Sequence, residues 1–225
     1  MADTKISSLT ALTGADTDTA ADVLAIVDTS VTTTKKMLVD ELAVALASTQ
    51  AEVNAMTSTN TLLTPNLNKI ILGTEVASTS GTAIDYTGFP AAVRRITIHF
   101  VGVSTNGTSN IIIQLGDSGG IETSGYVGGA NTSSGGTVGA YSAGFIVKLN
   151  VAAAKLVNGH ITLVLEDSSD FTWTQSGVLI SSDALIATIS AGYKPLSAEL
   201  TQLRITTANG TDTFDAGAVN VSYER

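Results

Sequence analysis

Two histidines, two pairs of aspartates and two aromatic residues in turn-rich stretches are the side chains that could do chemistry. His99 and His160 each lie in or beside an expected strand, and neither has another histidine or a carboxylate at metal-ligand spacing. The chain contains no cysteine, which excludes disulfides, thiolate metal sites and thiol catalysis. The sequence therefore predicts no catalytic residue, no metal site and no cofactor.

One aspartate pair, Asp212 and Asp215, lies in the stretch NGTDTFDAG at residues 209–217. A calcium-binding loop needs five or more oxygen ligands at defined steps and a distal glutamate, which this stretch does not supply. A tight hairpin turn with Asn209 and Gly210 at its tip explains it better. A carbohydrate-cleaving enzyme would need carboxylates clustered in a groove, and here they are scattered through turns.

The aromatic candidates for ligand contact are Tyr126 and Trp173. Tyr126 lies in a glycine-rich stretch, residues 116–136, which is either a plain connection or a loop that presents an aromatic ring beside small polar groups. Such a mixture suits a glycan, because a sugar has an apolar face and a rim of hydroxyls. Trp173 lies in the turn EDSSDFTWT, and two interpretations stay open: a ligand contact or a core residue.

Composition excludes several classes of function. The chain has 225 residues, of which only 14% are charged, and its net charge is −9. Nucleic-acid binding would require a basic stripe, and none is present. No apolar run approaches the 18 residues of a membrane span, and the N-terminus lacks the apolar core of a signal peptide. We therefore expect no nucleic-acid partner and no membrane insertion.

The element expected to organise the chain is a helix over residues 37–64. Its apolar positions recur at spacings of 3 and 4 residues, which is typical of the seam of a coiled coil. The alternative is one amphipathic helix lying on its own domain. The seam predicts an interface between chains at Val39, Leu42, Leu46, Thr49, Val53 and Met56.

The segment before this helix, residues 1–36, carries too few apolar residues to fold alone. Two short extended pieces, VLAIVDTS and VTTTKKMLV, are expected to form a hairpin that leads into the helix. The run of apolar residues in the first piece could pair with the surface of another protein. The residues predicted to dock in this way are Val23, Leu24, Ile26 and Val27.

Residues 68–225 are expected to form an antiparallel β-sandwich or jelly roll. Short stretches of alternating apolar and polar residues follow one another between polar turns, with Ile96, Ile98 and Phe100 sharing one face of the first of them. Some strands are apolar on both faces, since Val101 and Val103 are expected opposite Phe100. A monomer would expose these side chains and an oligomer would bury them.

Two parts of the chain resemble bacteriophage virion fibre proteins. The stretches KISSLTALTG and ADVLAIVDTSVTTTKKMLVDEL resemble the short N-terminal module of phage virion appendage proteins. Residues 89–126 and 200–224, which begin FPAAVRRITIHFVGV and LTQLRITTANGTDTF, resemble the C-terminal domain of phage tail fibres. Together these stretches cover roughly half of the chain.

The resemblance implies a homotrimer in the virion, with residues 1–36 as the attachment segment, 37–64 as a coiled-coil stalk and 68–225 as a β head. The partner of the attachment segment would be another virion protein, either a tail adaptor or the capsid. As a tail fibre, the head would engage the host surface, with a glycan as its ligand. The alternative is a capsid decoration protein or head fibre that projects from the shell.

Overall fold

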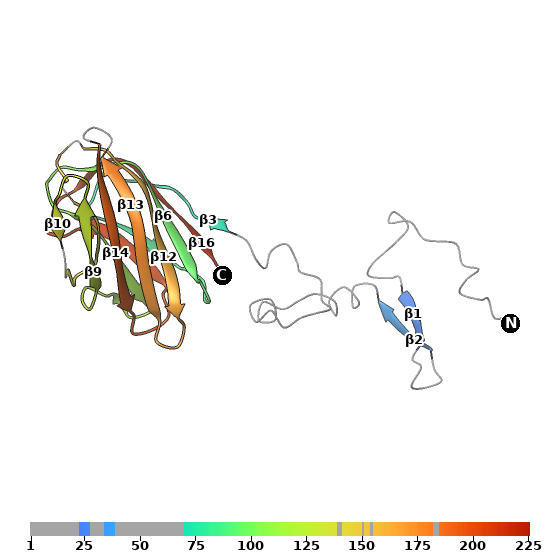
Figure 1. Ribbon diagram of the computed structural model, residues 1–225. Coiled ribbons are helices and arrows are strands. Elements are labelled where there is room, and N and C mark those ends of the chain that lie inside the picture. Colours follow the sequence, from blue (N-terminus) through green and yellow to red (C-terminus); the bar gives the residue numbers. More distant parts are fainter. Residues whose placement is uncertain are drawn as a thin grey trace, which may run out of the picture. The chain divides into compact units, whose positions relative to one another are not determined.

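The computed structural model describes residues 23–27, 34–38, 70–138, 141–149, 151–153, 155–181 and 185–225 (Figure 1). The chain divides into two units, Met1–Leu67 and Asn68–Arg225, which are treated separately below. Within the described residues every regular element is a β-strand. The predicted mainly β fold is therefore confirmed for this part of the chain.

The first unit contains the hairpin expected from the sequence. Strand β1 (Val23–Val27) pairs antiparallel with β2 (Thr34–Leu38), and the register runs from Val23 opposite Leu38 to Val27 opposite Thr34. β-Branched and long apolar residues favour the extended backbone of these two strands. Met37 and Leu38, predicted as the start of the coiled-coil helix, belong to β2 instead, so the predicted start of the helix is wrong. Residues 39–64 of the predicted helix lie outside the described residues.

The second unit contains a large antiparallel sheet of nine strands in its described residues. Across this sheet the order is β10-β9-β14-β13-β12-β6-β16-β3, and β4 also pairs with β16. The strands are β10 (Thr137–Val138), β9 (Val127–Thr132), β14 (Ile186–Pro195), β13 (Thr172–Ser181), β12 (Val157–Asp167), β6 (Arg95–Thr105), β16 (Phe214–Glu224), β3 (Ile71–Leu72) and β4 (Val76–Ala77).

A smaller antiparallel sheet has the order β11-β7-β15-β5, and β8 pairs with β7. Its strands are β11 (Phe145–Lys148), β7 (Ile111–Asp117), β15 (Gln202–Thr207), β5 (Ala83–Thr87) and β8 (Gly120–Ile121). Side chains of both sheets belong to one buried cluster, so the two sheets share a core. This arrangement fits the expected β-sandwich.

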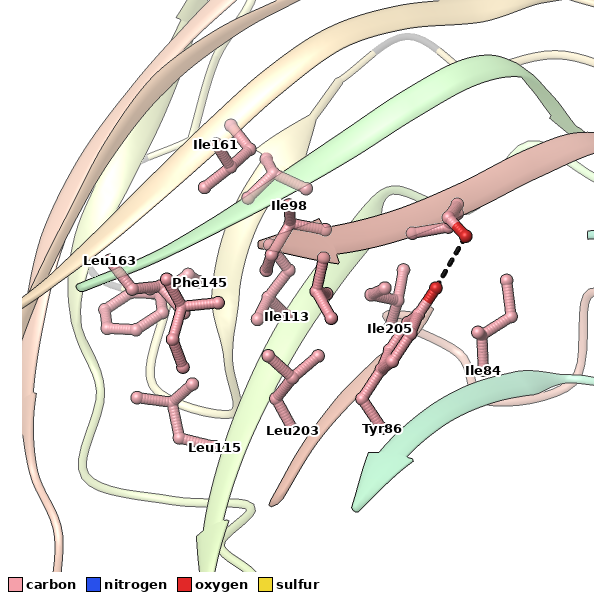
Figure 2. Packing of buried hydrophobic residues seen from close by; sticks show 14 of the residues in the cluster. Ile84, Tyr86, Ile98, Ile113, Leu115, Phe145, Ile161, Leu163, Leu203 and Ile205 are labelled. Atoms are coloured by element: carbon pink, nitrogen blue, oxygen red, sulfur yellow. Dashed lines mark hydrogen bonds between the residues drawn. The ribbon is translucent and has the colours of Figure 1, made fainter. Parts of the chain in front are cut away.

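The core fills the space between the facing sides of the two sheets (Figure 2). The predicted inward residues of β6, Ile96, Ile98 and Phe100, are at most 2% exposed. Tyr86 on β5 spans the layers and donates its hydroxyl to the carbonyl oxygen of Val219 on β16, at 2.5 Å. Burial raises the pKa of Tyr86 to about 12, so this hydroxyl stays a donor at physiological pH.

Val103 points into the core, whereas the sequence predicts it on the opposite side of β6 from Phe100. Val101 is 62% exposed as expected, but Val103 is fully buried. The cause is an irregularity between β6 and β16, where the register shifts on both sides of Ala216. Gly102 and Gly217 both have positive φ there, 63° and 86°, and their backbones approach so closely that a side chain on Gly217 would overlap Gly102. This bulge reverses the alternation and turns Val103 inward.

The stretch around Asn209 is a turn, but it is not a hairpin. Asn209 Oδ1 accepts hydrogen bonds from the backbone N–H groups of Thr211 and Asp212, as an Asx turn does. The strand before it, β15, belongs to the small sheet, and the strand after it, β16, belongs to the large sheet. The turn therefore carries the chain from one layer of the sandwich to the other.

Candidate functional site

Tyr126 is not an exposed ligand contact, and that prediction is corrected by the structure. Its side chain is 2% exposed and its ring packs edge-on against Phe145, with ring centroids 4.9 Å apart. Its hydroxyl oxygen accepts the Leu115 N–H at 2.6 Å and donates to the Glu122 carbonyl oxygen at 2.9 Å. The glycine-rich stretch around it is also partly regular, since it contains strands β8 and β9.

Trp173 is a core residue, which agrees with one of the two interpretations left open by the sequence. It lies on β13 with 1% of its surface exposed. Its indole N–H is buried and has no hydrogen-bond acceptor in the described part of the chain. An exposed stacking platform is therefore excluded at Trp173, but its surroundings include a cavity that is considered further below.

A charged network holds the loop after β14 against the small sheet. Ser197 donates its hydroxyl to Asp117 at 2.6 Å and its backbone N–H to Glu122 at 2.8 Å. The ammonium group of Lys194 forms an ion pair with Glu122 and lies 5.6 Å from the centre of the Tyr126 ring. These contacts link the loop to the buried ring of Tyr126.

Acid should weaken this network. Hydrogen bonds from Ser197 and the Gly119 N–H lower the pKa of Asp117. Burial raises the pKa of Glu122, but hydrogen bonds from Lys194 and Ser197 outweigh burial and lower it. Both carboxyl groups have pKa values below the ordinary values of about 3.9 and 4.3. Their stabilisation is therefore fully present above those ordinary values and is lost as the pH falls further, through the lowered pKa values of the folded protein.

The measurement is urea unfolding at pH 7 and pH 3 of the wild-type chain and of Ser197→Ala. At pH 7 we expect the variant to be less stable by about 1.5 kcal/mol, the typical contribution of a hydrogen bond to a charged group. At pH 3 the difference should be smaller, because uptake of protons by Asp117 and Glu122 removes the charge that strengthens their hydrogen bonds to Ser197. An equal difference at the two pH values would contradict the role given to Ser197.

The pentapeptide GDSGG at Gly116–Gly120 fits the pattern G-x-S-x-G of hydrolase nucleophiles. In the structure its Ser118 lies in the turn between β7 and β8, whereas a nucleophile of that class needs a strand-to-helix turn. The neighbouring carboxylate of Asp117 is engaged by Ser197 and by the Gly119 N–H. The motif therefore builds a turn here and does not supply a nucleophile.

No cluster of three or more metal-ligating side chains occurs among the described residues. That part of the chain also holds no helix with the length and hydropathy of a membrane span.

The large sheet has one side that points away from the core, which we call the outer face. The strands that form it lie side by side in Figure 1. One row of directly paired residues crosses six of them: Asn220, His99, His160, Val178, Ile189 and Asn131. A second row consists of Ser222, Thr97, Thr162, Ser176, Ala191 and Gly129.

Large apolar side chains stand exposed on the outer face. The exposed fractions are 62% for Val101, 49% for Val178, 36% for Ile180 and 62% for Ile189. Val178 is paired with Ile189, and Ile180 lies two residues further along β13 on the same side. The two rows given above contain no acidic residue and no lysine or arginine. Such a neutral, partly apolar sheet surface is typical of a protein contact.

The two histidines meet on this face, which the sequence analysis missed. His99 and His160 are direct partners on β6 and β12, with ring centroids 6.4 Å apart. The Nε2 atom of His99 lies 3.2 Å from the hydroxyl oxygen of Ser222. Strand alternation placed both histidines on the polar side of their strands, but only the register between β6 and β12 brings them together.

The predicted attachment residues Val23, Leu24, Ile26 and Val27 all belong to β1. The backbone hairpin that holds them is thus confirmed, while their docking role stays a prediction. The predicted chain–chain contacts lie outside the described residues: Val39, Leu42, Leu46, Thr49, Val53 and Met56.

Comparison with known proteins gives no relative for this chain. No family description, no curated protein and no solved structure matches it.

Proposed function

We propose that this chain is a structural protein of a bacteriophage virion, a short homotrimeric fibre with a projecting β head. The resemblance of both ends of the sequence to phage fibre proteins supports the class. The observation that carries the oligomer is the set of exposed aliphatic side chains on the outer face of the large sheet, Val101, Val178, Ile180 and Ile189. The charged residues Arg95 and Glu224 on the same face pair with each other. In this proposal the β1–β2 hairpin attaches to another virion protein and the seam from Val39 to Met56 forms the stalk.

The outer face is large enough to serve as an interface between chains. Six strands spaced about 4.8 Å apart, each contributing roughly eight residues of about 3.3 Å, span on the order of 600 Å² of flat sheet. A standard interface buries about 800 Å² of accessible surface on each partner, and the side chains add to the flat area. Burying Val178 and Ile189 against another chain would remove from water the apolar groups that a monomer leaves exposed.

A tail fibre is the first form of the proposal, because a β head that projects from the particle suits adhesion to a host surface. Capsid decoration is the alternative position of the same trimer. The position decides between host attachment and shell stabilisation, and it can be observed directly on particles.

A tag placed after Arg225, the exposed last residue of the sequence, should be visible on assembled phage particles by immunogold electron microscopy. The proposal predicts label at the tail. Label distributed around the shell would replace adhesion by decoration. A tagged chain that is folded and soluble but is found on no part of the particle would overturn the virion assignment. Tagged chains that start at Val39 serve as the control for attachment, because they lack the hairpin.

A further inference from the structure

We propose that a cavity at one end of the sandwich binds a single sugar ring of a host-surface glycan, an inference that rests on the adhesion form of the proposed function. The cavity has a volume of about 230 Å³. Its lining includes Arg94, Leu165, Ser168, Phe171, Trp173 and Glu199. These residues come from the segment before β6, from the adjoining ends of β12 and β13 with the turn between them, and from the loop after β14.

The walls of the cavity are fixed to one another by hydrogen bonds. The backbone N–H of Ala92 donates to Glu199 Oε1 at 2.6 Å, which joins the segment before β6 to the loop after β14. The Leu196 N–H donates to the Phe171 carbonyl oxygen at 3.2 Å, which joins that loop to the β12–β13 turn. The Asp117–Ser197–Glu122 network anchors the same loop from outside. A ligand would therefore meet a formed site and would not have to order it.

The backbone at the cavity is held in conformations that are costly for ordinary residues. Three non-glycine residues in the described part of the chain have positive φ, and two of them line this cavity: Ala92 at 63° and Phe171 at 55°. Such conformations persist only where surrounding contacts hold them, and they cluster at active sites and ligand sites. The hydrogen bonds of Ala92 and Phe171 to the opposite loop are contacts of this kind.

A second observation points to a missing partner. Trp173 lines the cavity, and its buried indole N–H has no acceptor within the described residues. Buried donors in native proteins are nearly always paired with protein, water or ligand atoms. A water molecule or a ligand atom beside Trp173 would supply that acceptor.

The polar and apolar groups are divided as a sugar ring requires. Phe171 and Leu165, which are both partly exposed, offer apolar surface for the C–H face of a ring. Arg94 is exposed and forms no ion pair with a described residue, so its N–H groups can donate to ring hydroxyls. Glu199 uses Oε1 for Ala92, and its Oε2 accepts from no described residue, which leaves an acceptor for a hydroxyl.

The volume of the cavity and the net charge of the chain restrict the class of ligand further. Pockets for drug-sized molecules measure roughly 300–1,000 Å³, so a cavity of about 230 Å³ suits one ring and not an oligosaccharide. The net charge of −9 repels polyanions at long range, which favours a neutral hexose or N-acetylhexosamine at the end of a chain.

The test uses the fluorescence of Trp173, because it is the only tryptophan in the sequence and therefore reports on this cavity alone. The full-length protein is titrated separately with glucose, galactose, mannose and N-acetylglucosamine. We expect a saturable change in emission for at least one sugar, with half-saturation in the millimolar range. In Arg94→Ala and in Glu199→Gln the half-saturating concentration for that sugar should rise about tenfold.

Arg95→Ala is the matched control. Arg95 is the next residue, is equally charged and exposed, and does not line the cavity; its ion pair with Glu224 is long, at 3.6 Å. It should bind the sugar as the wild type does, and thermal unfolding should show that all variants are folded. The proposal fails if none of the sugars changes the emission saturably, or if Arg95→Ala and Arg94→Ala weaken binding equally. If sugar binding fails but the C-terminal tag is still detected on the phage particle, the proposed function stands and only the sugar site is wrong.

Discussion

Replacing Tyr126 by alanine should lower the free energy of unfolding by about 3–5 kcal/mol, the range for removing a large aromatic side chain from a core. Tyr126 is 2% exposed, and its ring would leave a gap beside Phe145. The variant also removes the acceptor of the Leu115 N–H and the donor to the Glu122 carbonyl oxygen. Urea unfolding followed by circular dichroism measures the loss.

Tyr126→Phe distinguishes the contribution of the ring to stability from that of the hydroxyl. It keeps the contact with Phe145 but leaves the Leu115 N–H buried without a partner, which costs about 1–3 kcal/mol. Ser124→Ala is the control, because Ser124 is exposed in the same loop and should change stability by less than about 0.5 kcal/mol. If Tyr126→Ala is no more destabilising than Ser124→Ala, the ring is exposed in solution as the sequence alone suggests.

Alternation was sufficient to predict which residues of long, regular strands enter the core. Ile96, Ile98 and Phe100 are buried as expected, because successive side chains of a strand point to opposite faces. The β1–β2 hairpin was predictable for a similar reason, since two short runs of strand-forming residues flank a polar turn. Both features are determined by the pattern of neighbouring residues, so a single sequence is enough to predict them.

Features that depend on contacts distant in sequence were not predictable. The inward turn of Val103 requires a bulge formed by Gly102 with Gly217, which are more than a hundred residues apart. The path of the chain after Asn209 into the other sheet likewise leaves no local signal, because a turn looks the same in either case. The glycine-rich sequence around Tyr126 suggested exposure, but a ring can be buried from a loop when its hydroxyl finds backbone partners.

The candidate sites also combine features that local sequence predicts with features that depend on contacts distant in sequence. The sequence identified Trp173 and a surrounding turn but not the cavity, whose walls come from segments far apart in the chain. Arg94 and Glu199 carried no signal as a pair, because the loop that holds Glu199 reaches the segment of Arg94 only in the folded sandwich. The sequence did predict apolar side chains on the outside of β6, and the exposure of Val101 agrees with this.

The double substitution Val178→Asp and Ile189→Asp should dissociate the assembly into single chains. These side chains are paired with each other on β13 and β14 and point away from the core. In a trimer built through the outer face, the new carboxylates would be buried without cations at a cost of several kcal/mol per chain. Sedimentation equilibrium should give three chains of 22.9 kDa, about 69 kDa, for the wild type and about 23 kDa for the variant.

The matched control is Leu185→Asp, which places the same charge at an apolar side chain that is 75% exposed and lies in a turn before β14. It should keep the wild-type mass. Both variants should keep the β spectrum, because none of the three side chains belongs to the core clusters. A double variant that remains at 69 kDa would show that the chains are held together elsewhere, with the seam from Val39 to Met56 as the remaining source of the contact. A wild-type mass of 23 kDa would remove the trimer altogether, because the exposed aliphatic residues would then be tolerated in water by a monomer.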